Sequence, residues 1–243
     1  MTEREAQRRL LELGYEQGAV EVLVAHFADA ERRGKTFHGF SRVRWLETLD
    51  VDPAARPMLL ESEDGFERWD GHGTLGYLVL DEIVRATLAD SPARARVVVA
   101  RRCFPTGMLG HWVRRLADGG LVAALTATSP RRLMPPGGGE PLTGTNPLAI
   151  AIPSSDGRPL VADVSMGAVT HGAVLAGVAR PEDLVPFGGE QAHKAFAIAV
   201  GLELFVGALA GPEHGAVLVA ARPDHDPVPG FRELADGRRL PGD

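Results

Sequence analysis

Apolar residues recur at helical spacing through the first part of the chain. Leu10, Leu13, Val20, Leu23 and Phe27 fall close to one face of a helix with 3.6 residues per turn. The pattern predicts a helical segment over residues 3–33. We expect Gly18 to divide it into two helices and Gly34 to end the second, because glycine interrupts helices. A shorter amphipathic stretch, residues 43–49, predicts another helix, and the prolines that follow it mark a loop.

Strand and helix patterns alternate along the rest of the chain. Short runs rich in β-branched residues predict strands at 66–69, 96–100, 121–126, 148–152, 160–162 and 216–221. Longer stretches with helical spacing predict helices at 75–88, 109–117 and 193–209. This alternation indicates an α/β architecture. The tail from Arg222 is rich in Pro, Asp and Gly, and we expect it to wrap the surface.

The most apolar stretch, residues 195–210, is interrupted by Glu203. At roughly 16 residues it is shorter than the ~20 needed to cross a bilayer, so we interpret it as a buried helix. The first five residues, Met1–Glu5, include three charged residues and are followed by more charge, and this lack of an apolar h-region predicts no secretory signal and no membrane partner.

Composition and charge exclude several functional classes. Hydrophobic residues make up 44% and charged residues 24% of the 243, as in ordinary globular proteins. The net charge of −6 gives no basic field for a nucleic acid. The single cysteine, Cys103, excludes an internal disulfide and favours the reducing cytoplasm. The eight histidines show no metal-ligand spacing, so no metal site is expected.

Familiar catalytic motifs do not occur either. The chain has no P-loop and no serine in G-x-S-x-G, and its three consecutive glycines do not connect a strand to a helix. These motifs therefore indicate no function beyond that of an α/β domain.

A series of weaker motifs is more informative because of its order. The segments are 35–45, 70–76, 107–112, 120–130, 137–147, 160–165, 186–194 and 239–243. The most specific is Gly137–Pro147, which matches G-G-x-E-x-x-x-G-T-N-P almost letter for letter. In this order the segments resemble the malate/L-lactate dehydrogenase-type family of nicotinamide-dependent oxidoreductases, in a shortened and diverged form. That family includes ureidoglycolate dehydrogenase and the piperideine/pyrroline-2-carboxylate reductases.

The resemblance implies a fold and an activity. The fold is non-Rossmann α/β, a mixed sheet flanked by helices with a helical N-terminal part. We expect residues 1–50 to form a helical segment, 51–221 the cofactor-binding core and 222–243 a tail that packs back on it. The implied activity is reduction of a small 2-oxo acid or cyclic 2-imino acid, a small carboxylate substrate, with NADH or NADPH. The resemblance also implies a homodimer.

On the substrate side, the resemblance implies roles for residues in two segments. His38 would polarise or protonate the substrate, and Arg42 would bind its carboxylate with a bidentate pair. Thr145 and Asn146 would contribute short hydrogen-bonding side chains to substrate binding. The alternatives are a helix-start histidine bonded to backbone and a solvated arginine.

On the cofactor side, Ser129, Asp163, Ser165 and Lys194 match the family's contacts with the nicotinamide cofactor. Lys194 precedes an apolar helix, where a cation and the helix N-terminus together favour phosphate. The alternatives are a turn serine, a helix-cap aspartate and a surface lysine.

The chain departs from the family where the chemistry is expected. Pro105 stands where the family has a histidine thought to transfer a proton, and proline cannot do so. His111, on a predicted helix, is a candidate replacement acid because imidazole titrates near neutral pH; a packed histidine is the alternative. Phe37 replaces a serine beside His38, which should dry the site and lower the pKa of His38. A second hypothesis is therefore a descendant that catalyses a redox-neutral step, such as isomerisation, or only binds a metabolite.

Overall fold

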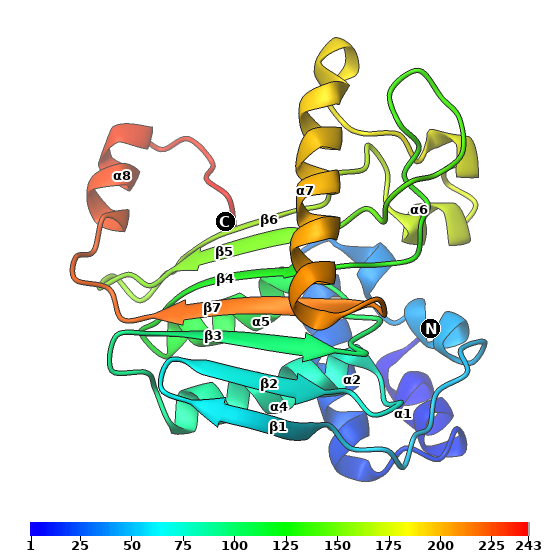
Figure 1. Cartoon of the computed structure of the whole chain (residues 1–243), viewed down its shortest axis with the longest axis horizontal. Helices are drawn as coiled ribbons and strands as arrows, with labels where there is room; N and C mark the ends of the chain where they lie inside the picture. The colour runs from blue at the N-terminus through cyan, green and yellow to red at the C-terminus, as the bar shows by residue number, and fades with distance from the viewer. Residues whose placement is uncertain (243) are drawn as a thin grey trace.

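The fold is built on a seven-stranded mixed sheet, shown in the computed structural model, which describes residues 1–242 (Figure 1). The strands are β1 (Met58–Glu63), β2 (Phe66–Asp70), β3 (Ala95–Arg101), β4 (Val122–Ala127), β5 (Leu148–Ile152), β6 (Leu160–Val164) and β7 (Gly215–Ala221). Their order is β1-β2-β3-β7-β4-β5-β6. Only β2 and β3 pair in parallel; the other neighbours are antiparallel. The prediction of a mixed, non-Rossmann α/β sheet is confirmed.

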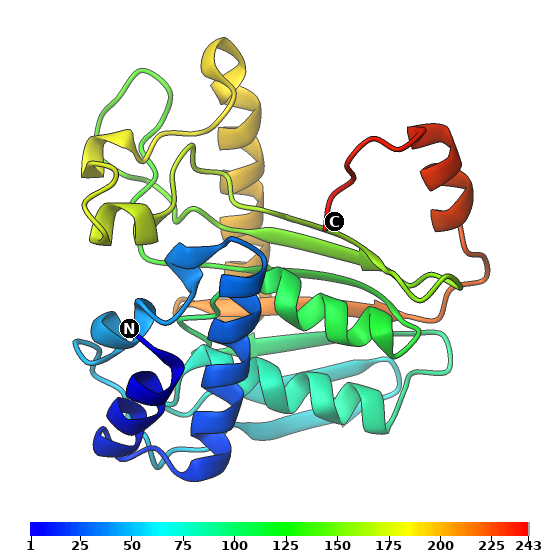
Figure 2. The ribbon, with the colours of Figure 1, turned by 180° about the vertical axis from the view of Figure 1, so that it is seen from behind.

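Helices cover the two faces of this sheet unequally. They are α1 (Glu3–Glu12), α2 (Gln17–Arg32), α3 (Arg42–Leu46), α4 (Gly76–Ala89), α5 (Leu109–Asp118), α6 (His171–Leu175), α7 (Ala192–Ala210) and α8 (Val228–Ala235). Helices α2, α4 and α5 lie on one face (Figure 2), and the main core forms there from side chains such as Phe27, Leu80, Trp112 and Leu125. On the other face α7 crosses the sheet near one end and projects beyond it.

The first two helices are separated at a different glycine from the one expected. Helix α1 ends before Gly14, whose φ of +93° is a left-handed conformation that favours glycine. Gly18 lies inside α2, so the break predicted there is wrong. A helix tolerates one glycine at a modest cost, whereas a left-handed residue ends it.

Strand β1, helix α8 and the short helix α6 were not predicted. Strand β1 pairs with β2 across a turn at Asp64 and Gly65, and its residues are mostly exposed, so it carries no apolar alternation. Helix α8 lies in the tail and is held to the β5–β6 turn: Arg232 binds Asp156 at 2.6 Å, and the Ser155 hydroxyl donates to Asp226 at 2.7 Å. The division at residues 50 and 221 stays a prediction, and Asp243 lies outside the described residues.

Helix α7 forms where expected, but the prediction that it is buried is wrong. Ala195, Ala199, Val206 and Ala210 are its buried residues. By length and composition alone the segment Gly189–Ala210, with mean hydropathy 1.5, could cross a membrane, and only 17% of its most apolar window is buried. Its inward side packs on the sheet through Val206 and Ala210. The apolar character of the other side therefore needs a different explanation from burial in this chain's core.

Candidate active site

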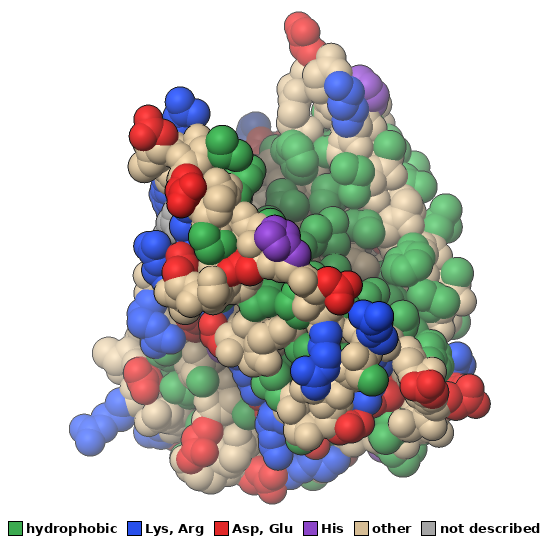
Figure 3. Space-filling model, turned by 90° about the vertical axis from the view of Figure 1, so that its left-hand side faces the viewer, with side chains coloured by type: hydrophobic (Ala, Val, Ile, Leu, Met, Phe, Trp, Pro, Cys, Tyr) green, Lys and Arg blue, Asp and Glu red, His purple; other side chains and the backbone are tan. Residues whose placement is uncertain are grey.

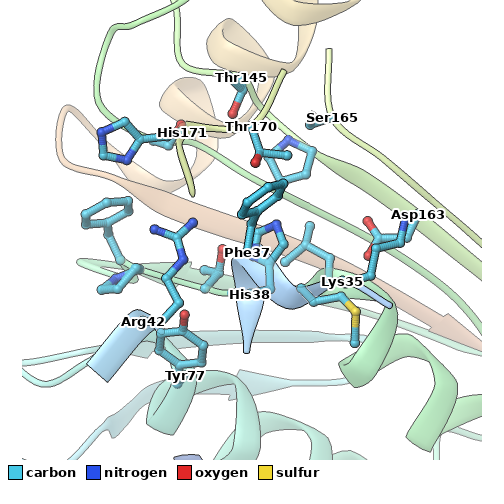
Figure 4. Close-up of a pocket in the computed structure, with 18 of the residues that line it drawn as sticks. Lys35, Phe37, His38, Arg42, Tyr77, Thr145, Asp163, Ser165, Thr170 and His171 are labelled. Atoms are coloured by element: carbon cyan, nitrogen blue, oxygen red, sulfur yellow. The ribbon is translucent and has the colours of Figure 1, made fainter. Parts of the chain in front are cut away.

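A cavity of about 350 Å3 opens between the segment after α2, the start of α5 and the loops that follow β4 and β6. Figure 4 shows Arg42 and His171 toward one end, Lys35 and Asp163 toward the other, and Phe37 and His38 between them. The local sequence explains how the first segment enters the cavity. Gly39 ends the 3-10 turn Thr36–His38, and its contact with the Glu31 side chain leaves no room for a Cβ.

Arg42 is a buried cation without an acidic partner. It begins α3, is 8% exposed, and its Nε and Nη1 atoms are buried with no hydrogen-bond partner among the described residues. Its guanidinium lies 4.9 Å from the centre of the Trp45 ring. Burial removes this charge from water and thereby lowers the pKa of Arg42. An unpaired buried guanidinium destabilises the free protein and favours an anionic ligand.

His38 lies next to Arg42 and is neutral at pH 7. Burial, followed by the charges of Arg42 and Lys35, lowers its pKa from 6.5 to about 3, so the predicted downward shift is confirmed. Its Nδ1 atom is buried and unpartnered. A neutral imidazole can donate one hydrogen bond and accept another, which suits it to a polarised carbonyl or imine.

Tyr77, which sequence reasoning missed, completes this end of the cavity from helix α4. It is 1% exposed, and burial raises its pKa to about 12. Gly107 approaches it so closely that a Cβ there would lie 2.2 Å from the Tyr77 ring and 2.6 Å from the His26 ring. The glycine of the 107–112 segment is thus required by packing around the cavity.

The opposite end of the cavity contains Asp163, a residue of β6 whose side chain reaches the start of α5. The Gly110 N–H donates to its Oδ2 at 2.8 Å, and a Cβ on Gly110 would lie 2.9 Å from that oxygen. Burial raises the pKa of Asp163, and the charge of Lys35 opposes that shift. Ser129 and Ser165 line the same cavity. The fold therefore brings the predicted cofactor residues Ser129, Asp163 and Ser165 together in one cavity. Ser129 lies 34 residues before Asp163 in the sequence.

A second cavity of about 530 Å3 shares Lys35, Met108 and Asp163 with the first. Arg32 and Arg33, from the end of α2, line it. The Asp163 end thus continues into a region with several cationic side chains, which is suited to phosphate groups.

Two predicted site residues in the G-T-N-P block have different positions. Thr145 lines the cavity. Asn146 is fully buried, and its amide donates to the Ala199 carbonyl at 3.1 Å and to Glu203 at 2.6 Å. The Gly144 N–H also donates to Glu203, at 3.2 Å. Asn146 therefore fastens α7 to the loop before β5, and the expectation that it contacts substrate is replaced by this structural role.

His111 and Lys194 do not reach the cavity. The His111 ring lies 2.9 Å from Asp29 on α2, and this contact helps to lower the pKa of Asp29 to about 2. His111 points away from the cavity because it sits on the α2 side of α5, so we withdraw it as the replacement acid. Lys194 is exposed in the first turn of α7 and lines neither of these two cavities. Arg132 and His171, which no motif singled out, do line the first.

Comparisons with known proteins agree with this architecture. Residues 2–183 match the family model described as malate/L-lactate dehydrogenase. The chain is 29% identical to a Delta(1)-pyrroline-2-carboxylate/Delta(1)-piperideine-2-carboxylate reductase of Pseudomonas putida, over 82% of this chain and 66% of the relative. It is 32% identical to a (2R)-3-sulfolactate dehydrogenase (NADP(+)) of Chromohalobacter salexigens, over 67% of this chain and 50% of that one. The chain thus spans less than two thirds of the length of these relatives.

Solved structures show the same fold over nearly the whole chain. The delta1-piperideine-2-carboxylate reductase of Pseudomonas syringae superposes with a TM-score of 0.84 at 26% identity, covering 98% of this chain and 88% of that one. A dehydrogenase of Sinorhizobium meliloti gives a TM-score of 0.86 at 22% identity, covering 99% and 87%.

Proposed function

The chain belongs to the malate/L-lactate dehydrogenase family, and we propose that it reduces a small 2-oxo acid or cyclic 2-imino acid with NADH or NADPH. This proposal rests mainly on one observation: Arg42 and Asp163 lie at opposite ends of the same cavity, and His38 lies between them. A buried, unpaired guanidinium is suited to a substrate carboxylate, and a carboxylate facing a cavity is suited to ribose hydroxyls. The names of the P. putida and C. salexigens relatives support the same class of reaction.

The residues at the Asp163 end fit a nicotinamide cofactor. Asp163 Oδ2 is fixed by the Gly110 N–H, and no described residue bonds to Oδ1. Ser129 and Ser165 add hydroxyl groups, and the adjoining cavity provides Lys35 and Arg33 for phosphate oxygens. We assign the cofactor to this end and the substrate to the Arg42 end.

When bound, the nicotinamide supplies the hydride. Arg42 would hold the substrate carboxylate, and the N–H of neutral His38 would polarise the carbonyl or imine. Trp45, Phe104 and His171 form an aromatic wall, with ring centroids 6.0 Å and 6.1 Å from Trp45 to Phe104 and His171. With substrate bound, this wall would limit the access of water to the reacting carbon.

Cofactor binding is the direct test of this proposal. At a free concentration of about 100 times Kd, NADH or NADPH should stabilise the protein by ~2.7 kcal/mol, read as a rise in melting temperature. Asp163→Asn should reduce that rise because the ribose loses a charged acceptor. The control is Asp118→Asn. Asp118 is an exposed carboxylate at the far end of α5, the helix whose Gly110 contacts Asp163, and its replacement should leave the rise in melting temperature unchanged.

No shift with either cofactor at millimolar concentration would end the dehydrogenase proposal. The redox-neutral alternative would then take its place. Pro105 lines the cavity, and this observation keeps the alternative open because proline transfers no proton.

We also propose that the chain forms a homodimer through the exposed apolar side of α7. Ile198, Leu204, Phe205 and Leu209 are exposed on this helix. Figure 3 shows hydrophobic side chains gathered along the projecting helix and in the hollow beside it. Because the other side of α7 packs on β3 and β7, the helix cannot enter a bilayer without uncovering the sheet. A second copy would cover the face without that loss.

Introducing charge on this face should prevent dimerisation. We expect light scattering to give a dimer for the unmodified chain at micromolar concentration and a monomer for Phe205→Glu. Leu11→Glu, equally exposed but on α1, is the matched control and should remain dimeric. A monomeric unmodified chain would reject the proposal, and sedimentation of that monomer with lipid vesicles would assign the face to a membrane.

A cytoplasmic location and the lack of nucleic-acid partners remain predictions from the sequence.

A further inference from the structure

We propose that Glu203, the one acidic residue of helix α7, is a positioning residue for the cofactor site, on which it acts through Gly144 and Ser129. This inference rests on the proposed function, because it takes Ser129 as a contact of the nicotinamide cofactor. Glu203 interrupts the most apolar stretch of the chain. A carboxylate in such a helix costs free energy unless hydrogen-bond donors surround it. The partners of Glu203 therefore indicate why the helix carries it.

The Glu203 carboxylate accepts two hydrogen bonds from the loop before β5. The Asn146 amide donates to Glu203 Oε2 at 2.6 Å, and the Gly144 N–H donates to the same oxygen at 3.2 Å. The Asn146 amide also donates to the carbonyl of Ala199, at 3.1 Å. Ala199 lies one helical turn before Glu203, so adjacent turns of α7 hold the three residues 144–146.

This loop has a conformation that needs such support. Asn146 has a φ of +29°, in the left-handed region that residues other than glycine adopt infrequently. Its Oδ1 atom is buried and has no hydrogen-bond partner among the described residues. Both features cost free energy, and the bonds to α7 offset that cost. Loss of the Glu203 carboxylate should therefore let the loop relax.

The same loop sets the position of Ser129. A Cβ on Gly144 would overlap both the hydroxyl and the carbonyl oxygen of Ser129, so the Gly144 backbone lies directly against that residue. Ser129 and Thr145 both line the first cavity. The Thr145 carbonyl accepts from the N–H of Met166 at 2.8 Å, and Met166 follows Ser165 in the sequence. A displacement of Gly144 would thus move the Ser129 hydroxyl within the cavity that we assign to the cofactor and substrate.

Titration of NADH and NADPH against the full chain and three variants, at a temperature where each is folded, tests this role. Glu203→Leu should weaken the tighter-binding nucleotide by about tenfold or more, because displacement of a positioned group by ~1 Å can cost up to about 100-fold. Glu203→Gln keeps an oxygen acceptor, and its affinity should stay within about threefold of the unmodified chain. The control is Val206→Ala, which removes packing of α7 against Val99 and Val217. It should lower the melting temperature without weakening either nucleotide.

A double variant shows whether the effect passes through Ser129. Ser129→Ala alone should weaken nucleotide binding, and Glu203→Leu should then add less than about twofold, because both changes remove the same contact. An equal effect of Glu203→Leu with and without Ser129→Ala would overturn the inference. Equal losses of affinity in Glu203→Gln and Glu203→Leu would also overturn it, and so would equal weakening by Val206→Ala, which would assign the effect to the packing of α7 in general.

Amide hydrogen exchange separates this inference from the proposed reduction. In the nucleotide-free protein, the Gly144 N–H should exchange about tenfold faster or more in Glu203→Leu, and close to the unmodified rate in Glu203→Gln and Val206→Ala. If neither nucleotide binds the unmodified chain but this difference is observed, the proposed reduction fails and Glu203 still positions the loop. Unchanged exchange in Glu203→Leu would overturn the inference whichever ligand the cavity binds.

Discussion

Arg42→Met should nearly abolish reduction while stabilising the substrate-free protein. The variant removes the proposed partner of the substrate carboxylate, and loss of one member of a buried charged pair costs about 2–5 kcal/mol. We therefore expect kcat/KM to fall by roughly 10² to 10³-fold or more. Without substrate, the variant also removes a charge that is 8% exposed and has no acidic partner.

The gain in stability comes from this second effect. An unpaired buried polar group costs about 1–3 kcal/mol, and loss of the contact with Trp45 offsets ~0.5–1 kcal/mol of the gain. We expect unfolding in urea to show Arg42→Met more stable by about 1 kcal/mol. Arg44→Met, an exposed position on the same short helix, should change neither kcat/KM nor stability appreciably. A destabilised Arg42→Met variant with normal kcat/KM would show that the guanidinium serves folding and not the substrate.

Sequence patterns predicted the helices and strands in which a continuous run or one face of residues is buried. The β-branched run 96–100 is buried between β2 and β7, and the strand forms as expected. Strand β1 escaped prediction because an exposed edge strand carries no alternation to detect. Helix α7 was placed correctly but assigned the wrong surroundings, because apolar composition does not distinguish a chain's own core from a surface that a partner covers.

The candidate site was only partly predictable for a related reason. His38, Arg42, Ser129 and Asp163 belong to segments with a recognisable motif, and the fold brings them to one cavity. Arg132 belongs to no motif, and backbone pairing with distant segments, at Thr143 and Leu184, fixes where its loop lies. Asn146 shows the opposite failure. Its motif was recognised, but the side chain faces α7, which sequence order alone does not reveal.

The source of the proton in the proposed reduction can be narrowed by geometry. Pro105 lines the cavity but carries no titratable group, and His111 is bound to Asp29 outside it. Of the donors that the sequence offered, His38 and water remain, and His171 and Tyr77 also line the cavity as neutral groups. The folded-state pKa of His38, about 3, is below the unfolded value near 6.5. Its neutral form thus adds stability above pH 6.5 that is lost as the pH falls toward 3, and at pH 7 His38 donates a hydrogen bond from an uncharged ring.

His38→Asn should therefore distinguish ketone from imine substrates. Reduction of a 2-oxo acid builds negative charge on the carbonyl oxygen, which the N–H of neutral His38 stabilises while water supplies the proton, so this reaction should slow by ~10²–10⁴-fold. A cyclic 2-imino acid can arrive protonated and needs only the hydride, so we expect it to lose about tenfold or less, the part due to polarisation and orientation. Steady-state rates for both substrates between pH 5 and 9 would show the difference, and NADH and NADPH should bind the variant normally.

His111→Asn is the matched histidine control. It should keep the rates for both substrates and lower only stability, because Asp29 would lose the partner that holds it at 2.9 Å. The reverse result, full activity in His38→Asn and loss in His111→Asn, would contradict the assignment and move the proton path to α5. An equal loss for ketone and imine in His38→Asn would also contradict it. His38 would then orient the substrate in both reactions without stabilising charge on a ketone oxygen.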